Sequence, residues 1–168
     1  LELFEDVVGA LEASDIIPIR SERKRWRVIG KNDLGLSYSD SAFWLYFELE
    51  NRSSDRQWYL ELNWPALDSA FLYNSDAKLL QRTGDLFPYS SWPVMHPIPT
   101  LGIQLQPGEK AAYFLKIKSA SVLSFPVYLK GITSFEKDAA QYIAIMFLIA
   151  GMLFLFLIQN FINFFHHK

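Results

Sequence analysis

The sequence of 168 residues contains no cysteine. Without cysteine, neither a disulfide framework nor a thiolate metal site can form. This absence leaves the cellular compartment open, because proteins of oxidising compartments do not need disulfides to fold. Strong charge of one sign is also missing, since the net charge is −2. The composition therefore gives no electrostatic case for binding nucleic acid.

Recognisable catalytic motifs are missing as well. The sequence has no Gly-x-Ser-x-Gly, no His-Glu-x-x-His and no phosphate-binding glycine loop. Histidine occurs only three times, with His96 alone in a proline-rich stretch and His166 and His167 near the end. We predict that this chain is not an enzyme and that it binds no cofactor and no metal.

Two minor alternatives concern carboxylates. A pair that cleaves glycosidic bonds is spatial and not sequential, so Asp40, Asp68 and Asp85 stay open as members of a hydrolase site. Asp68 and Asp85 are better interpreted as turn residues that bond their own backbone. A calcium site built from Asn32, Asp33 and Asp40 also stays open, although their spacing matches no known calcium loop.

A long apolar run near the end is the most prominent feature that is present. Residues 142–158 contain no charge and no amide, and the apolar character continues to residue 165. About 24 helical residues span roughly 36 Å, enough to cross a bilayer core of about 30 Å. The alternative is a buried core helix, but the rest of the chain is too small to surround it. The run predicts a transmembrane helix over about residues 142–165.

Three polar residues interrupt the end of this run. Gln159 and Asn163 lie four residues apart and share a helix face, and Asn160 lies between them. Polar side chains in membrane helices usually face other helices. These three residues are therefore predicted to pack against further membrane helices, unless they already lie at the bilayer surface.

The preceding residues alternate with the period of β-strands. In residues 42–51, Phe43, Leu45, Phe47 and Leu49 share one face, and Trp44, Tyr46 and Glu48 share the other. Such runs, separated by turn residues, predict a two-sheet antiparallel sandwich of about eight strands. The predicted strands lie within residues 26–31, 42–51, 57–64, 68–74, 78–82, 100–105, 110–118 and 122–131.

The first residues carry weaker signals. Residues 1–19 favour a short strand and then a helical turn with Leu11, Ile16 and Ile17 facing inward. Residues 20–27 include five basic side chains, which we interpret as a solvated loop; an anion site for lipid phosphates is the alternative.

The junction between the two parts is short. We place the sandwich in residues 1–131 and the helical part in residues 132–168. Thr133 and Glu136 have the spacing of a capping box, which predicts a helix from about Ser134. No linker separates the two parts. Since the sequence begins without Met and stops soon after the apolar run, we expect it to be a piece of a longer membrane protein.

A ligand site is predicted where strands end and in the proline-rich stretch of residues 86–99. Prolines exclude this stretch from a central strand, and loops of a sandwich commonly carry function. Aromatic faces with a few polar groups suit a small molecule. Trp44 and Trp58 are instead assigned to the core. The candidate ligand-binding residues are Tyr38, Asp40, Trp64, Tyr89, Trp92 and His96.

Four blocks give the sequence a family resemblance: LGLSYSDSAFWLYFELEN, WYLELNWPALDSAFLY, GDLFPYSSWPVMHP and LQPGEKAAYFLKIKS. In this order, and followed by the apolar run with Asn160, they resemble extracellular domain 2 and the first membrane helix of the bacterial seven-transmembrane receptors with diverse intracellular signalling modules. The resemblance extends over about residues 4–168. It implies a jelly-roll sandwich shaped like a carbohydrate-binding module and placed in the periplasm. It also implies six more membrane helices and a cytoplasmic output domain.

Two positions depart from the family pattern. Tyr46 and Trp92 stand where the family often has arginine, so aromatic rings here suit a sugar ring or another flat ligand better than an anion. We predict a periplasmic sensing module of a receptor in the bacterial inner membrane, with a carbohydrate or other small molecule as ligand. The alternative is a membrane-tethered carbohydrate-binding or adhesive domain without signalling. A homodimer is left open.

Overall fold

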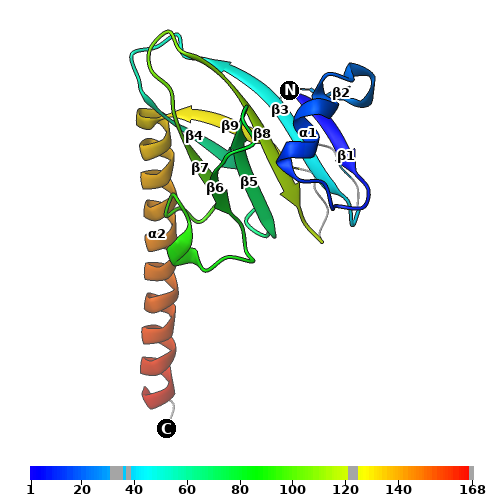
Figure 1. The fold of residues 1–168 in the computed structure, drawn as a ribbon. Helices are drawn as coiled ribbons and strands as arrows, with labels where there is room; N and C mark the ends of the chain where they lie inside the picture. Colours follow the sequence, from blue (N-terminus) through cyan, green and yellow to red (C-terminus); the bar gives the residue numbers. More distant parts are fainter. Residues whose placement is uncertain (31–35, 37–38, 121–124, 167–168) are drawn as a thin grey trace. The chain divides into compact units, whose positions relative to one another are not determined.

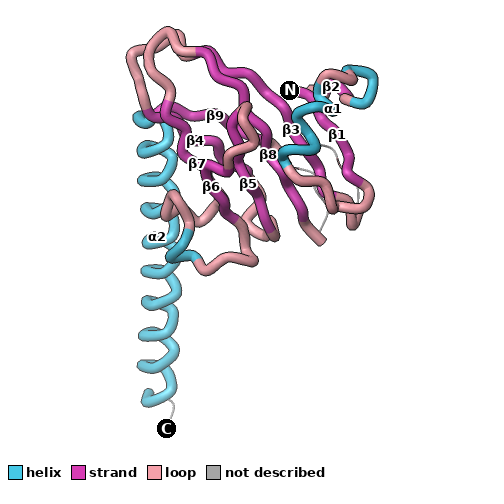
Figure 2. Tube along the Cα trace, viewed as in Figure 1, coloured by secondary structure: helices cyan, strands magenta, loops and turns pink. Residues whose placement is uncertain are grey.

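The structure is a computed structural model that describes residues 1–30, 36, 39–120 and 125–166. The chain divides into two compact units, Leu1–Ile132 and Thr133–Lys168. The first unit contains all strands of the described residues, and the second consists of one long helix (Figures 1 and 2).

The first unit is a sandwich of two antiparallel sheets. Six strands form one sheet in the order β2-β1-β3-β8-β5-β6, and three form the other in the order β7-β4-β9. This confirms the predicted jelly-roll sandwich; the described residues contain nine strands, where about eight were expected. The strands are β1 Glu2–Asp6, β2 Arg27–Val28, β3 Ala42–Glu50, β4 Gln57–Leu62, β5 Ser69–Asn74, β6 Leu79–Thr83, β7 Thr100–Gln104, β8 Lys110–Lys118 and β9 Val127–Gly131.

The two faces of β3 carry the side chains predicted for them, and the apolar side chains of the two faces pack into two separate cores. Phe43 and Leu45 point into the space between the sheets, where side chains of both sheets pack. Trp44 points to the opposite face and is fully buried there. Both faces of β3 are therefore covered. The main core includes Phe43, Leu45, Leu60, Leu62, Leu72, Leu101, Ile103, Leu115 and Ile117.

A short helix covers the second face. Helix α1 (Ala13–Arg20) buries Ile16 completely, beside Trp26 and Trp44. Its start is stabilised by a reciprocal capping box between Glu12 and Asp15. The predicted strand and helical turn in the first 19 residues are thus both present, although the helix continues past Pro18.

The basic run mostly lies at the surface. Its 3₁₀ turn η1 (Arg23–Arg25) has no buried residue. Arg20 differs, because its guanidinium stacks over the Tyr46 ring at 4.1 Å and pairs with Glu2 at 3.0 Å. The interpretation as a solvated loop therefore holds for η1, whereas Arg20 belongs to the packed layer of the sandwich.

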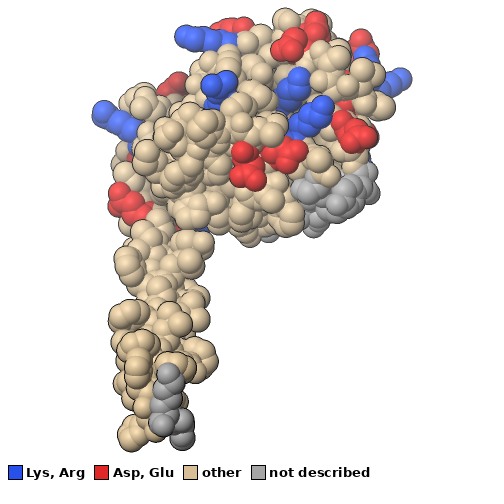
Figure 3. Space-filling model, turned by 90° about the horizontal axis from the view of Figure 1, so that it is seen from below, with Lys and Arg blue, Asp and Glu red and all other residues tan. Residues whose placement is uncertain are grey.

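Helix α2 (Ile132–His166) forms the second unit. It begins at the residue after β9 and two residues before the predicted start. Thr133 therefore lies inside the first turn and is not the N-cap, a shift within the usual uncertainty of helix ends. Within the described part of the chain, α2 is the one helix long and apolar enough to cross a membrane. Figure 3 shows charges of both signs on the sandwich and almost none along the helix.

Candidate functional site

An open cleft of about 600 Å³ lies where the edge of one sheet meets the edge of the other. Strand β6 of the six-stranded sheet and strand β7 of the three-stranded sheet border it, and β4 extends its floor. The proline-rich loop between β6 and β7 contributes one wall. The cleft is lined by Gln57, Tyr59, Leu80, Gln81, Pro93, Val94, Gly102, Ile103, Gln104 and Tyr113.

Strand alternation explains why amides collect there. Along β4, Leu60 and Leu62 point into the main core, so Gln57 and Tyr59 point away from it. Strand β7 pairs with β4 so that Gln104 lies opposite Gln57 and Gly102 lies opposite Tyr59. The register thus places two glutamines side by side, with a tyrosine ring next to them.

Gln81 connects the two sheets at this edge. Its Oε1 accepts a hydrogen bond of 2.7 Å from the backbone N–H of Gly102, although Gln81 belongs to β6 and Gly102 to β7. A Cβ added at Gly102 would lie 3.1 Å from Nε2 of Gln57. The missing side chain at Gly102 therefore leaves room for the amides of both neighbouring strands.

A second, smaller cleft of about 200 Å³ shares two of these residues. It is lined by Arg56, Gln57, Gln104 and Gln106. Gln57 and Gln104 thus lie between the two hollows, and a row of side-chain amides extends along this surface. We call the two hollows together the amide cleft.

The chemistry of the amide cleft favours a neutral polar ligand. A side-chain amide carries both donors and an acceptor, so neighbouring glutamines match the alternating hydroxyl groups of a sugar or the backbone of a peptide. The Tyr59 side chain adds an aromatic surface. Arg56 supplies the charge among the lining residues. Within the described residues, no group of three or more His, Cys, Asp or Glu side chains is placed to hold a metal ion.

Tyrosines buried in the sandwich predict instability in alkali. Burial, with the nearby Glu109 charge as a smaller cause, raises the pKa of Tyr113 above its ordinary value of 10.0. Burial likewise raises the pKa of Tyr73 and of Tyr46. A raised pKa means that the folded state holds the proton more tightly, so this stability is complete below pH 10 and is lost as the pH rises further.

We therefore expect the free energy of unfolding to fall steadily above about pH 10, because 10 is the ordinary pKa of tyrosine. Denaturant titrations between pH 8 and pH 11 measure this slope. Tyr113→Phe removes one of the three phenols, and its slope is expected to be shallower than that of the parent. An identical slope in the variant would contradict the role given to burial.

Of the predicted ligand residues, the five that the structure describes do not line the amide cleft. Trp92 is half-buried, and its indole N–H is shared between the backbone carbonyls of Gly84 and Phe87, both at 3.2 Å. Tyr89 is half exposed and packs on the Trp92 ring at 5.2 Å. The same proline-rich loop contributes Pro93 and Val94 to the lining of the cleft.

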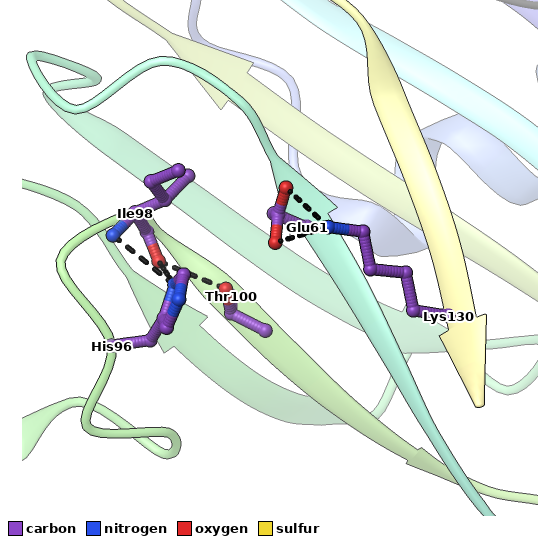
Figure 4. A network of polar contacts seen from close by, with 5 residues as sticks. All are labelled: Glu61, His96, Ile98, Thr100 and Lys130. Carbon is purple, nitrogen blue, oxygen red and sulfur yellow. Dashed lines mark hydrogen bonds and ion pairs between the residues drawn. The ribbon is translucent and has the colours of Figure 1, made fainter. Parts of the chain in front are cut away.

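The other predicted residues are dispersed. His96 is buried, and its Nδ1 lies 3.3 Å from both the N–H and the carbonyl oxygen of Ile98 (Figure 4). Trp64 is half-buried at the end of β4, and Asp40 is exposed before β3. Tyr38 lies outside the described residues, as do Asn32 and Asp33 of the calcium alternative. These residues remain untested as ligand contacts.

A buried ion pair lies on the same face of the three-stranded sheet as Tyr59. Both carboxylate oxygens of Glu61 accept hydrogen bonds of 3.0 Å from Nζ of Lys130, which joins β4 to β9 (Figure 4). Glu61 is 4% exposed. Removing either partner from such a pair leaves an uncompensated buried charge.

Of the carboxylates considered for catalysis, Asp68 takes a structural position. The Asp68 side chain accepts hydrogen bonds from Ser119 Oγ at 3.3 Å and from the backbone N–H of Ala120 at 2.9 Å. The expectation that it bonds its own backbone is therefore wrong, because it fastens a distant segment instead. Asp85 is exposed beside Gly84.

Sequence reasoning missed the glutamines of the amide cleft. The period-two pattern shows that Gln57 and Tyr59 share a face opposite to that of Leu60. It does not show that β7 pairs with β4, or that β6 approaches β7 across the gap between sheets. The only local signal is Gly102 in the middle of a strand, a position that often marks close approach of a neighbouring group.

Comparison with known families identifies the fold. The family model described as 7TMR-DISM extracellular 2 matches residues 1–130, and the chain belongs to this family. The resemblance drawn from the four sequence blocks is confirmed. The family is an extracellular receptor domain and not a catalytic one. Together with α2, it makes this chain a membrane-anchored receptor segment with an extracytoplasmic sandwich.

A GH31 alpha-xylosidase from Xanthomonas citri is similar over 76% of this chain and 13% of its own chain, with 12% identity and a TM-score of 0.41. The chain thus corresponds to a small part of that enzyme. A search among curated proteins returned no match.

Proposed function

We propose that this chain is the ligand-sensing module of a bacterial receptor, placed on the periplasmic side of the inner membrane. A neutral small molecule, most simply a carbohydrate, binds in the amide cleft. The observation that carries the proposal is the set of three glutamines, Gln57, Gln81 and Gln104, around one open hollow of about 600 Å³. Trp92, the aromatic residue first assigned to sugar stacking, is given no contact with the ligand.

The position of the cleft suits signal transfer. Its walls come from both sheets, so a ligand that bridges Gln81 and Gln104 favours one arrangement of the two edges. Strand β4 carries Gln57 and Tyr59 and pairs directly with β9, where Lys130 lies opposite Tyr59. Strand β9 continues into α2 at the next residue. A shift of β4 therefore reaches the start of the membrane helix through one strand pair.

The receptor context predicts partners for the helix. Gln159, Asn160 and Asn163 pack against the remaining membrane helices, which connect the module to a cytoplasmic output domain. The Asn160 amide also bonds the Phe156 carbonyl of its own helix at 2.8 Å. A tethered carbohydrate-binding domain without signalling would need no such helix contacts.

A binding experiment tests the ligand site. The full chain in lipid nanodiscs is titrated by calorimetry with cellotriose, maltotriose, xylotriose and chitotriose. We expect at least one sugar to bind, and Gln57→Ala or Gln104→Ala to weaken it by about 3- to 10-fold, the equivalent of one or two lost hydrogen bonds. Gln141→Ala is the matched control, because Gln141 is an exposed glutamine of α2. We expect this variant to keep the affinity of the parent chain. Equal affinities in all variants would exclude the amide cleft.

A further inference from the structure

The loop between β6 and β7 holds large apolar side chains in water. Leu86 is 73% exposed, Met95 is 71% exposed and Tyr89 is 50% exposed. Single exposed apolar residues are ordinary, but several within ten residues mark an interaction surface. We call residues 86–95 the apolar loop.

Charge is absent from this part of the chain. From residue 86 to residue 108 the sequence contains no Lys, Arg, Asp or Glu, although 20% of the whole chain is charged. A surface that binds another protein commonly carries charges at its rim, whereas a segment that enters the lipid boundary avoids them because ions are costly to bury there. The composition therefore favours lipid over a protein partner.

The apolar loop is also held in shape. The Trp92 indole N–H bonds the carbonyls of Gly84 and Phe87, and the Ser91 backbone N–H and hydroxyl both bond the Pro88 carbonyl, at 2.8 and 2.7 Å. These bonds fix the backbone while the apolar side chains point outward. Docking such a preorganised loop costs little conformational entropy.

The aromatic content matches the boundary between lipid and water. Tyr89 and Trp92 form a ring pair, and the guanidinium of Arg82 stacks on the Phe87 ring at 4.7 Å. Tyr and Trp are enriched at the level of lipid headgroups, where one side of the ring is apolar and the other is wet. Arg82 flanks the loop as a group suited to lipid phosphates.

The length of α2 keeps a bilayer within reach. The sandwich ends at Gly131 and the apolar run begins at Tyr142. The ten helical residues between them extend over about 15 Å. A domain tethered this closely meets the lipid surface continuously, so even weak apolar contacts are populated.

We propose that the apolar loop docks onto the bilayer that α2 crosses, with Leu86 and Met95 entering the leaflet that faces the sandwich. The proposal is independent of the ligand. Contact with lipid would also affect the amide cleft, because Pro93 and Val94 belong to the same loop and line the cleft. Docking on lipid therefore holds one wall of the cleft in place.

A spin label measures the depth of the loop. Because the chain lacks cysteine, Met95→Cys provides a unique attachment point in the full chain, reconstituted in phosphatidylethanolamine–phosphatidylglycerol nanodiscs. We expect the label to be more accessible to oxygen than to a water-soluble nickel chelate. Val8→Cys is the matched control, since Val8 is an exposed apolar loop residue at 83% and lies outside the apolar loop. The Val8 label is expected to show the opposite ratio.

A second variant tests whether lipid is the partner of the apolar loop. Leu86→Asp in the Met95→Cys background is expected to raise nickel accessibility at least threefold while the circular dichroism spectrum stays unchanged. Several results would overturn the proposal. One is a label at Met95→Cys that is as accessible to nickel as the label at Val8→Cys. Another is an unchanged label depth in the Leu86→Asp variant. The third is a label shielded from both oxygen and nickel, which would indicate a protein partner or a second copy of the chain.

Discussion

Replacing Gly84 by alanine is expected to lower the free energy of unfolding by about 3 kcal/mol or more, the range of strained backbone positions combined with steric overlap. Gly84 has a φ of +125°, and a Cβ there would lie 2.5 Å from the Asp68 carbonyl oxygen and 2.7 Å from Ser69 Cα. Both are backbone atoms at the start of β5. The overlap is relieved only if the hydrogen bond of 2.7 Å from Asp85 N–H to the Leu67 carbonyl is disturbed.

Gly108→Ala is the matched control for this change. Gly108 also has a positive φ, +80°, but nothing lies within 4 Å of the added Cβ. Only the backbone conformation is then unfavourable, which costs about 1 kcal/mol. Urea unfolding followed by circular dichroism measures both variants. Equal losses at the two positions would contradict the overlap at the start of β5.

Trp44→Ala is expected to destabilise the sandwich by about 3–5 kcal/mol, the usual cost of removing a large aromatic ring from a core. Trp44 is fully buried between β3 and the layer of α1. Its ring lies 5.6 Å from that of Tyr73, and the Lys116 ammonium lies 5.2 Å above it. The substitution leaves a cavity that a rigid sheet cannot close, so the loss is expected at the upper end.

Trp44→Phe separates packing from hydrogen bonding. Within the described residues, the Trp44 Nε1 atom is buried and meets no hydrogen-bond partner. Phenylalanine keeps most of the ring and removes this unpaired donor, so the loss is expected to stay below about 1.5 kcal/mol. The same urea titrations measure it. A loss as large as that of Trp44→Ala would show that the indole N–H has a partner that stabilises the fold.

The faces of the strands were predictable because apolar side chains alternate along them. The alternation of Phe43, Trp44 and Leu45 gives the correct faces of β3, and Leu60 and Leu62 do the same for β4. Ends of elements were less predictable. The Thr133–Glu136 spacing predicted a start of α2 near Ser134, whereas the helix begins at Ile132. A capping-box spacing in the sequence does not exclude helical residues before it.

The cleft depends on contacts that no local pattern encodes. Gln81 and Gly102 are 21 residues apart and meet only because two sheet edges converge. Aromatic residues in a proline-rich loop favoured Trp92 as a ligand contact. The structure shows a further role, because its indole N–H closes its own loop, and this role depends on the carbonyl positions of Gly84 and Phe87. Family resemblance predicted the receptor domain but not the position of this hollow.

Binding of a ligand in the amide cleft is tested most directly by the resonances of the side-chain amides. The full chain, with ¹⁵N in the side-chain nitrogens of glutamine and tryptophan, is reconstituted in nanodiscs and titrated with the sugar that binds best in calorimetry. We predict that the amide signals of Gln57, Gln81 and Gln104 shift together with one dissociation constant, while that of Gln141 does not move. Saturable binding that leaves all three signals unchanged, or that shifts only the Trp92 indole signal, would contradict the account.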